Sequence, residues 1–270
     1  MQNYICTTCG IQYAASEHYP VDICKICADD RQYVKASGQQ WTTLDELGQH
    51  HHNEIRRVEA DLTGIATVPA FAICQRPLLI QTPKGNVLWD CNSLIDEATV
   101  AALNVLGEVD ALAISHPHFY DSMVEWSRAF DDAPIYLHRD NEPWVMRPDK
   151  RIVYWETESY PLLPDVTLIR CGGHFPGSSV LHWAAGADGK GVLMTGDTIM
   201  VVADPRWVTF MYSYPNEIPL NRRAVERIVA AVEPFAYDRL YSAWWEKVIQ
   251  TDAKNAVKRS AERYIRAIGD

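Results

Sequence analysis

Two closely spaced cysteine pairs near the start of the chain limit most strongly what this sequence can fold into. Cys6 and Cys9 form one C-x2-C pair and Cys24 and Cys27 form another, with fourteen residues between the pairs. Each pair can wrap a turn around one ion, and two such turns complete the tetrahedral thiolate shell that zinc accepts in structural sites. Because four cysteines fill that shell, we expect a structural zinc and no catalytic role for it.

Residues 1–36 are polar and too few to bury a core of their own, so metal binding would supply most of their folding free energy. We interpret them as a zinc-ribbon-like segment, called the zinc knuckle below. The chain has seven cysteines. An odd number with four residues in close pairs is a poor match to a secreted disulfide framework. Reduced thiols in the cytoplasm are the expectation.

Composition excludes some classes of partner. The 270 residues are 47% hydrophobic and 22% charged, which is an ordinary balance for a globular protein. The formal net charge of −10 provides no broad cationic field for phosphate backbones or anionic lipids, so nucleic acid is disfavoured as a partner. The chain begins without a basic segment followed by an apolar one, and it has no apolar run long enough to cross a bilayer. We therefore expect no membrane contact.

The pattern of apolar residues predicts where the main domain begins. Residues 37–62 look helical in patches, and we interpret them as a connector. Short apolar runs bounded by turn residues begin at Ile65, and from there strand patterns are interleaved with amphipathic helices. This predicts a layered α/β domain over residues 63–270. Helices are expected at 94–106 with Ser93 as the N-cap, at 123–130, and in two late segments around 225–232 and 253–268.

Four metal-ligating side chains directly follow predicted strands. His116 and His118 come after the strand ALAIS, where alternate residues of an extended backbone point to the same side. His174 follows VTLIRC and two glycines, and Asp197 follows GVLMT in the sequence TGD. Three imidazoles and one carboxylate form a suitable ligand set for a divalent ion. Asp197 can complete that site, bridge to a second ion or simply cap a turn.

The order of these motifs resembles the metallo-β-lactamase superfamily. A strand, H-x-H, a glycine-flanked histidine and T-G-D occur in that order between residues 63 and 270. The resemblance implies an αβ/βα sandwich with one or two zinc, iron or manganese ions in a groove at the sheet edges. It also implies that His116, His118, His174 and Asp197 are ligands.

The chain departs from the family pattern H-x-H-x-D-H at two places. Tyr120 stands where the family has an aspartate, and Asp121 stands where it has the next histidine. The family's last histidine is also missing, because the corresponding stretch offers Ala243, Trp244 and Trp245. We therefore expect one tightly held ion, either zinc or another divalent metal such as iron or manganese. Asp121 can still bind a second ion, or it can serve as the N-cap of the helix that follows.

These residues suggest a hydrolase. A bound ion would lower the pKa of a water molecule and polarise a carbonyl or phosphoryl oxygen. Asp121 is the candidate general base, and Tyr120 is the candidate donor to a developing oxyanion. The expected substrate is a small ester, thioester, lactone, amide or phosphoester. Two alternatives remain: a non-catalytic metal- or ligand-binding module that contacts a protein partner through the zinc knuckle, and an RNA-processing nuclease, which the acidic balance disfavours.

Overall fold

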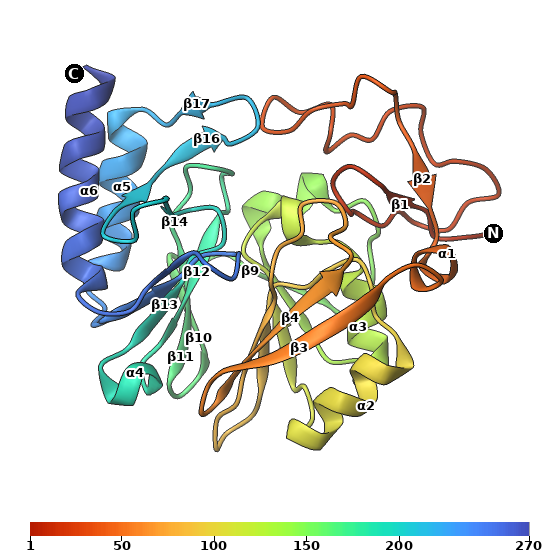
Figure 1. The fold of residues 1–270 in the computed structure, drawn as a ribbon, viewed down its shortest axis with the longest axis horizontal. Coiled ribbons are helices and arrows are strands. Elements are labelled where there is room, and N and C mark those ends of the chain that lie inside the picture. The colour runs from red at the N-terminus through yellow and green to blue at the C-terminus, as the bar shows by residue number, and fades with distance from the viewer. Residues whose placement is uncertain (270) are drawn as a thin grey trace. The chain divides into compact units, whose positions relative to one another are not determined.

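The computed structural model describes residues 1–269, and these form two compact units (Figure 1). The first unit contains residues 1–137 and 142–154, and the second contains residues 138–141 and the chain from Trp155 onward. Each unit is built on one mixed β-sheet. The two units are described separately below.

The sheet of the first unit has seven strands in the order β3-β4-β5-β6-β7-β8-β9. Strands β3 to β6 are joined as antiparallel neighbours, whereas β6, β7 and β8 run parallel. Pro83, Lys84 and Gly85 lie in the turn between the antiparallel strands β5 and β6. The strands are β3 (His52–Glu59), β4 (Leu62–Val68), β5 (Leu78–Ile80), β6 (Val87–Trp89), β7 (Ala111–Ala113), β8 (Ile135–His138) and β9 (Ile152–Trp155).

Two helices make the crossovers that parallel strands require. Helix α2 (Glu97–Leu106) connects β6 to β7, and α3 (Met123–Ala129) lies between β7 and β8 and packs on β7. Both helices were predicted, but the predicted N-cap of the first is wrong. The α2 helix is capped by Asp96, whose carboxylate accepts a hydrogen bond of 2.7 Å from the Thr99 amide. Ser93 instead lies buried against the zinc knuckle.

The predicted connector has more regular structure than its sequence indicates. It contains β2 (Trp41–Thr42), α1 (Leu44–Gly48) and β3. Strand β2 pairs with β1 (Ile5–Cys6) of the knuckle, and β3 pairs along its whole length with β4. The prediction that the sheet opens near Ile65 is therefore wrong. Because β3 is an edge strand with polar and charged side chains, it shows only weak hydrophobic alternation. The boundaries assigned to the knuckle, connector and main domain stay predictions.

The sheet of the second unit has six strands in the order β10-β11-β12-β13-β18-β19. Helices α5 (Arg222–Val232) and α6 (Ala253–Ile268) confirm the two predicted late helices; they lie side by side, α5 against β11 and α6 against β18 (Figure 1). Their buried faces, which include Val225, Ile228 and Val257, join sheet residues in one hydrophobic core. The strands are β10 (Ser159–Leu163), β11 (Val166–Arg170), β12 (Ser179–Trp183), β13 (Val192–Met194), β18 (Arg239–Tyr241) and β19 (Val248–Ile249).

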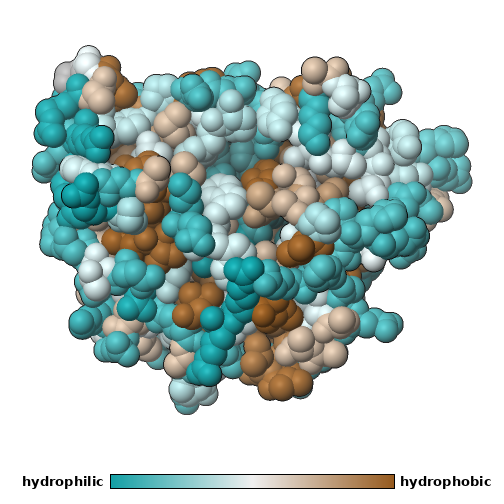
Figure 2. Space-filling model, viewed as in Figure 1, coloured by the Kyte–Doolittle hydropathy of each residue, from teal (hydrophilic) through white to brown (hydrophobic). Residues whose placement is uncertain are grey.

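The remaining elements are short. They are η1 (Pro117–Phe119), η2 (Arg139–Trp144), α4 (Gly186–Gly189), β14 (Met200–Val201), β15 (Val208–Thr209), β16 (Met211–Ser213) and β17 (Ile218–Pro219). Figure 2 shows small hydrophobic patches separated by hydrophilic surface on the face in view. Among residues 1–269, no helix combines the length and the apolar character needed to cross a membrane.

Candidate metal centres

The four knuckle cysteines converge as the sequence predicts. The Sγ atoms of Cys6 and Cys27 are 3.6 Å apart, those of Cys9 and Cys24 are 3.7 Å apart, and all four lie within 4.8 Å of one another. Zinc–sulfur bonds of about 2.3 Å at tetrahedral angles place two thiolates roughly 3.8 Å apart. A disulfide would need about 2.05 Å. The geometry therefore fits one ion in a four-thiolate shell, called the cysteine cluster below.

Polar groups around the cysteine cluster support negatively charged sulfur. The Tyr13 hydroxyl donates to Cys24 Sγ at 3.4 Å, and Gln39 Nε2 donates to Cys6 Sγ at 3.2 Å. Hydrogen bonds from neighbouring thiols lower the pKa of Cys6, whereas burial raises the pKa of Cys9. Several thiolates can be buried close together only if a cation neutralises their charge. The cluster is thus built for a metal.

In the first unit, the H-x-H turn lies at the carboxyl end of a parallel strand. Strands β6 and β7 are parallel, so the residues that follow them meet at one edge of the sheet. There Asp90 Oδ1 accepts a 2.8 Å hydrogen bond from the Ser115 amide, and Ser115 Oγ lies 2.9 Å from His116 Nδ1. This contact turns His116 Nε2 away from Ser115. His116 and His118 are both buried, and each offers a ring nitrogen within 4.8 Å of the other's.

In the second unit, His174 and Asp197 form the other pair of candidate ligands. His174 Nδ1 lies 3.2 Å from the Met211 carbonyl, so it donates there and leaves Nε2 on the side of Asp197. His174 Nε2 and Asp197 Oδ2 are 3.7 Å apart, and both side chains are buried. Metal bonds of about 2.0–2.2 Å at tetrahedral angles place two such donors roughly 3.4 Å apart. The observed spacing fits a shared ion.

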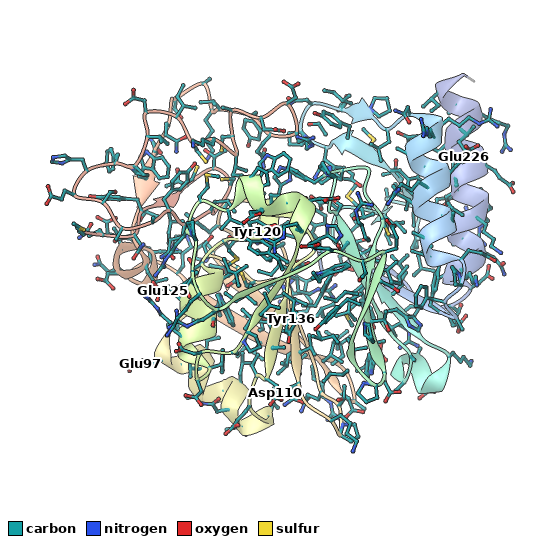
Figure 3. All side chains as sticks on the ribbon, turned by 180° about the vertical axis from the view of Figure 1, so that it is seen from behind. Glu97, Asp110, Tyr120, Glu125, Tyr136 and Glu226 are labelled. Carbon is teal, nitrogen blue, oxygen red and sulfur yellow. The ribbon has the colours of Figure 1, made fainter. Side chains whose placement is uncertain are left out.

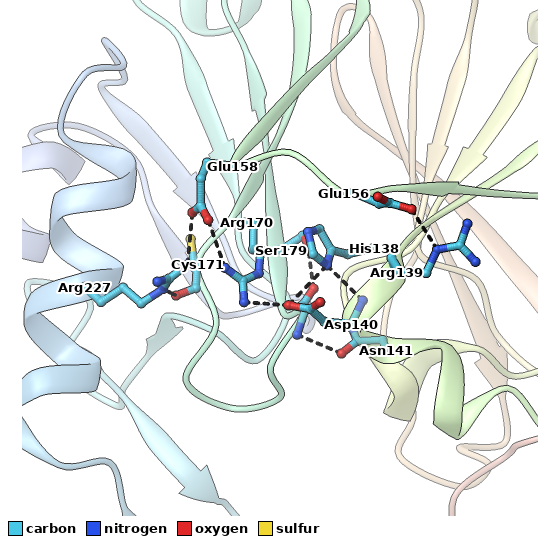
Figure 4. Close-up of polar contacts among 11 residues, drawn as sticks. His138, Arg139, Asp140, Asn141, Glu156, Glu158, Arg170, Cys171, Ser179 and Arg227 are labelled. Atoms are coloured by element: carbon cyan, nitrogen blue, oxygen red, sulfur yellow. Dashed lines mark hydrogen bonds and ion pairs between the residues drawn. The ribbon is translucent and has the colours of Figure 1, made fainter.

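The loop that carries His174 is held from two sides (Figure 4). Arg227 Nε, from α5, donates to the Cys171 carbonyl at 3.1 Å, and Asn141 Oδ1 accepts from the Gly177 amide at 2.9 Å. Both anchors lie within the second unit, on either side of His174 in the loop. Arg227 also forms an ion pair with Glu158. Glu158 in turn pairs with Arg170, and Arg170 pairs with Asp140.

Sequence reasoning missed Tyr214, which lies beside this pair. Its hydroxyl donates to the Asp197 carbonyl at 2.9 Å, and its ring centroid is 5.9 Å from that of His174. Burial raises the pKa of Tyr214, and the nearby Asp197 charge raises it further. The sequence shows only an aromatic-rich stretch there, WVTFMYSYPNEIPL. No local spacing links that stretch to the TGD motif.

The predicted catalytic pair lies in the first unit. Asp121 accepts hydrogen bonds from Ser93 Oγ at 2.5 Å and from Gln75 Nε2. Its carboxylate does not belong to the groups of clustered ligand atoms found among residues 1–269. The N-cap position of α3 is Ser122, so Asp121 is not that helix's cap. Its roles as base or second-metal ligand stay predictions, as does the donor role of Tyr120, which is buried (Figure 3).

The position of the missing histidine is used structurally. After β18, Ser242 Oγ donates to the Ile199 carbonyl at 3.0 Å and accepts from the Val201 amide at 2.9 Å. Ala243, the next residue, is buried and has no ligand atom. The expectation of a single ion in the large domain stays a prediction.

Comparisons with solved structures identify the fold. VMB-1 aligns with a TM-score of 0.59 and 9% identity over 81% of this chain and 99% of its own. The DIM-1 metallo-β-lactamase gives a TM-score of 0.56 and 12% identity over 80% and 98%. The FIM-1 metallo-β-lactamase from Pseudomonas aeruginosa, solved in a mono-zinc form, gives a TM-score of 0.56 and 11% identity. That alignment covers 78% of this chain and 95% of FIM-1. The chain therefore has the mixed α/β sandwich fold of the metallo-β-lactamases, as predicted.

A curated relative identifies the family of the chain. The uncharacterized protein YmaE of Bacillus subtilis (strain 168) is 48% identical over 270 residues, covering 99% of this chain and 97% of that protein. No family model matches the chain. The chain belongs to the same family as YmaE.

Proposed function

We propose that the chain is a metal-dependent hydrolase in which His116, His118, His174 and Asp197 together hold one divalent ion. The supporting observation is that each unit presents two buried ligand atoms at a spacing that one ion can bridge. Three nitrogens and one oxygen suit zinc, and iron or manganese is the alternative. The fold shared with the metallo-β-lactamases supports bringing these ligands to one site.

The chain's own residues would orient the ligands and prepare the site for water activation. Ser115 and the Met211 carbonyl fix the ring orientations of His116 and His174, so that the Nε2 atom of each ring is held in one direction for metal binding. When bound, the ion supplies Lewis-acid polarisation and water activation. Tyr120 is the proposed donor to the developing oxyanion. A Tyr120→Phe variant should then lower turnover without losing metal.

Metal content tests the site directly. Elemental mass spectrometry should find about two ions per wild-type chain, one in the cysteine cluster and one held by His116, His118, His174 and Asp197. The matched His116→Ala, His118→Ala variant should keep the cysteine-cluster ion and lose the other. A wild type that holds no more metal than this variant would contradict the proposal.

Turnover tests the reaction class. We expect hydrolysis of at least one member of a panel of generic small esters, thioesters, lactones, amides and phosphoesters, and no hydrolysis by His116→Ala. Equal rates in both proteins would indicate a contaminating enzyme.

None of the seven cysteines forms a disulfide within residues 1–269, which supports our proposal of a reducing, cytoplasmic location.

A second candidate function is partner binding through the zinc knuckle. The observation that favours it is the exposure of large apolar side chains there: Tyr19 is 65% exposed, Ile23 50% and Tyr33 45%. A protein partner should then be captured by the wild type and by His116→Ala, but not by a Tyr19→Ser, Ile23→Ser variant. Capture that also requires His116 would favour the hydrolase site over this second candidate.

A further inference from the structure

Asp121 contacts the zinc knuckle as well as the H-x-H turn. Ser93 Oγ lies 2.5 Å from Asp121 Oδ1 and 2.9 Å from the carbonyl oxygen of Gly10. The Asp121 carbonyl accepts a hydrogen bond of 3.1 Å from the amide of Gln12. Gly10 directly follows Cys9, and Gln12 lies two residues further along, so both contacts reach the segment that carries the cysteine cluster. All of these groups are buried within the first unit.

The fit at Gly10 is tight. A Cβ atom added there would come within 3.0 Å of both Asp121 Oδ1 and Ser93 Oγ. The turn from Cys6 to Gly10 is closed by the Gly10 amide, which donates to the Cys6 carbonyl at 2.8 Å. The knuckle turn that places the first two thiolates is therefore the same turn that packs on the Asp121 carboxylate.

On its other side, Asp121 belongs to the turn that carries the histidines. It lies three residues after His118, two residues beyond the end of η1, and its backbone has a left-handed φ of +36°. Gln75 Nε2 donates both to Asp121 Oδ2 and, at 2.8 Å, to the Cys91 carbonyl. Cys91 Sγ in turn lies 3.6 Å from the Tyr120 carbonyl. Asp121 is thus fixed to the body of the first unit at the end of the H-x-H turn.

We propose that Asp121 is a positioning residue that fastens the zinc knuckle to the H-x-H turn. Metal in the cysteine cluster shapes the turn at Gly10, that turn holds Asp121, and Asp121 keeps His116 and His118 in place for their own ion. This inference rests on the proposed function. It also explains the departure from the family pattern, because the residue at the family's histidine position binds the knuckle.

Two glycines provide a matched test. Gly10 and Gly38 both have a φ of +85°, so alanine should strain the backbone equally at both positions. At Gly38 the added Cβ meets nothing within 4 Å, whereas at Gly10 it meets Asp121 and Ser93. Full-length zinc-loaded chains would be titrated with a chromophoric chelator, and the ions that remain would be counted by elemental mass spectrometry. We expect Gly10→Ala to release the histidine-site ion at a chelator concentration at least about tenfold lower than Gly38→Ala or wild type.

A second pair of variants separates positioning from direct catalysis or ligation and does not depend on Gly10→Ala folding well. Asp121→Asn keeps the size of the side chain and can still hydrogen-bond to Ser93 and Gln75, so it should retain the histidine-site ion better than Asp121→Ala. If Asp121 were instead a metal ligand, the amide would release the ion as readily as the alanine. If it were the general base, both variants would retain the ion equally and lose turnover.

The outcomes distinguish this inference from the proposed function. If the wild type holds a second ion but the two glycine variants release it equally, or Asp121→Asn is as defective as Asp121→Ala, the positioning role is wrong. If the wild type holds no ion beyond the cysteine cluster, the proposed function fails, and this inference fails with it.

Discussion

At the scale of single residues, the loop before His174 depends on glycines that accept left-handed backbone. Gly172 and Gly173 have φ values of +69° and +81°. A Cβ on Gly173 would lie 2.9 Å from Ile228 Cδ1 and 3.0 Å from Leu220 Cδ1, so the loop approaches the hydrophobic core closely at this point. Gly173 is therefore favoured both by the left-handed backbone and by the close packing at this position.

We expect Gly173→Ala to destabilise the chain by about 1–3 kcal/mol more than Gly189→Ala, because both alanines would have left-handed backbone but only the first overpacks the core. Gly189 is a suitable control, since its φ is +80° and an added Cβ meets nothing within 4 Å. Urea unfolding of the two variants measures the difference. Equal midpoints would mean that Ile228 and Leu220 move aside without cost.

Sequence reasoning found the candidate ligand residues, which the structure brings together in pairs, but not the residues that orient them. His116, His118, His174 and Asp197 could be predicted because each follows an apolar strand in a recognisable order. Their partners come from long-range packing, which leaves no local pattern. Gln75 and Asp121 are 46 residues apart, and Ser93, predicted as a helix cap, lies 83 residues from its partner Gly10.

At the scale of elements, helix α5 supports the loop that carries His174 as well as the core. Its Asn221 cap accepts a hydrogen bond of 2.9 Å from the Ala224 amide, and its apolar face includes Val225 and Ile228. Arg227 extends from the same helix to the Cys171 carbonyl. A single helix thus links the hydrophobic core to the loop that carries His174.

Arg227→Met should destabilise the second unit by about 1 kcal/mol, because it keeps the apolar stem but removes the hydrogen bond to Cys171. Arg222→Met is the matched control on the same helix. Its side chain pairs with Glu226 on the exposed surface, where an ion pair contributes little, so we expect no measurable change. Thermal or urea unfolding of both variants checks this, and equal losses would contradict a special role for Arg227.

Strand β12 gives the chain a predictable response to acid. Burial lowers the pKa of His182 from its ordinary 6.5, although the Ala236 carbonyl, 2.7 Å from Nε2, partly opposes the shift. As pH falls below 6.5, the unfolded histidine takes up a proton before the folded one does. The stability that His182 contributes is therefore present above that pH and is lost as pH falls toward the folded pKa.

We expect the loss of unfolding free energy between about pH 8 and about pH 5.5 to be smaller in His182→Gln than in wild type. Acid also releases metal, but that contribution is common to both chains and cancels when the two losses are compared. Urea unfolding of both proteins at both pH values measures the two losses of unfolding free energy. An identical loss in the two proteins would show that His182 does not titrate differently on folding.

The elements themselves were predicted where their periodicity was strong. The late helices α5 and α6 alternate clear apolar and polar faces, and both were found within a few residues. Strand β3 was missed because its exposed, charged side chains hide its pairing with β4. The short strands β14 to β17 span only two or three residues each, which is too few for a period to be seen.

At the scale of the whole molecule, the zinc knuckle differs from the rest of the chain in what stabilises it. The buried apolar side chains of residues 1–36 are few; they include Ile5, Ile11 and Ile26. A core of this size cannot offset the conformational entropy that is lost when the segment becomes ordered. A bound metal must therefore contribute most of the folding free energy of residues 1–36. The large sheets of both units have cores that do not depend on this ion.

Removing the metals should therefore expose the knuckle to trypsin first. The knuckle contains three basic residues, Lys25, Arg31 and Lys35, and cleavage after them requires local unfolding of the backbone. We expect early cuts at these positions in chelator-treated wild type, and without chelator in the Cys6→Ser, Cys9→Ser variant. The zinc-loaded His116→Ala variant should remain resistant there, because its cysteine cluster is intact. Mass spectrometry of the fragments identifies the sites. Knuckle cleavage at the same rate with and without chelator would show that the segment is held by its contacts with the first unit and not by its metal.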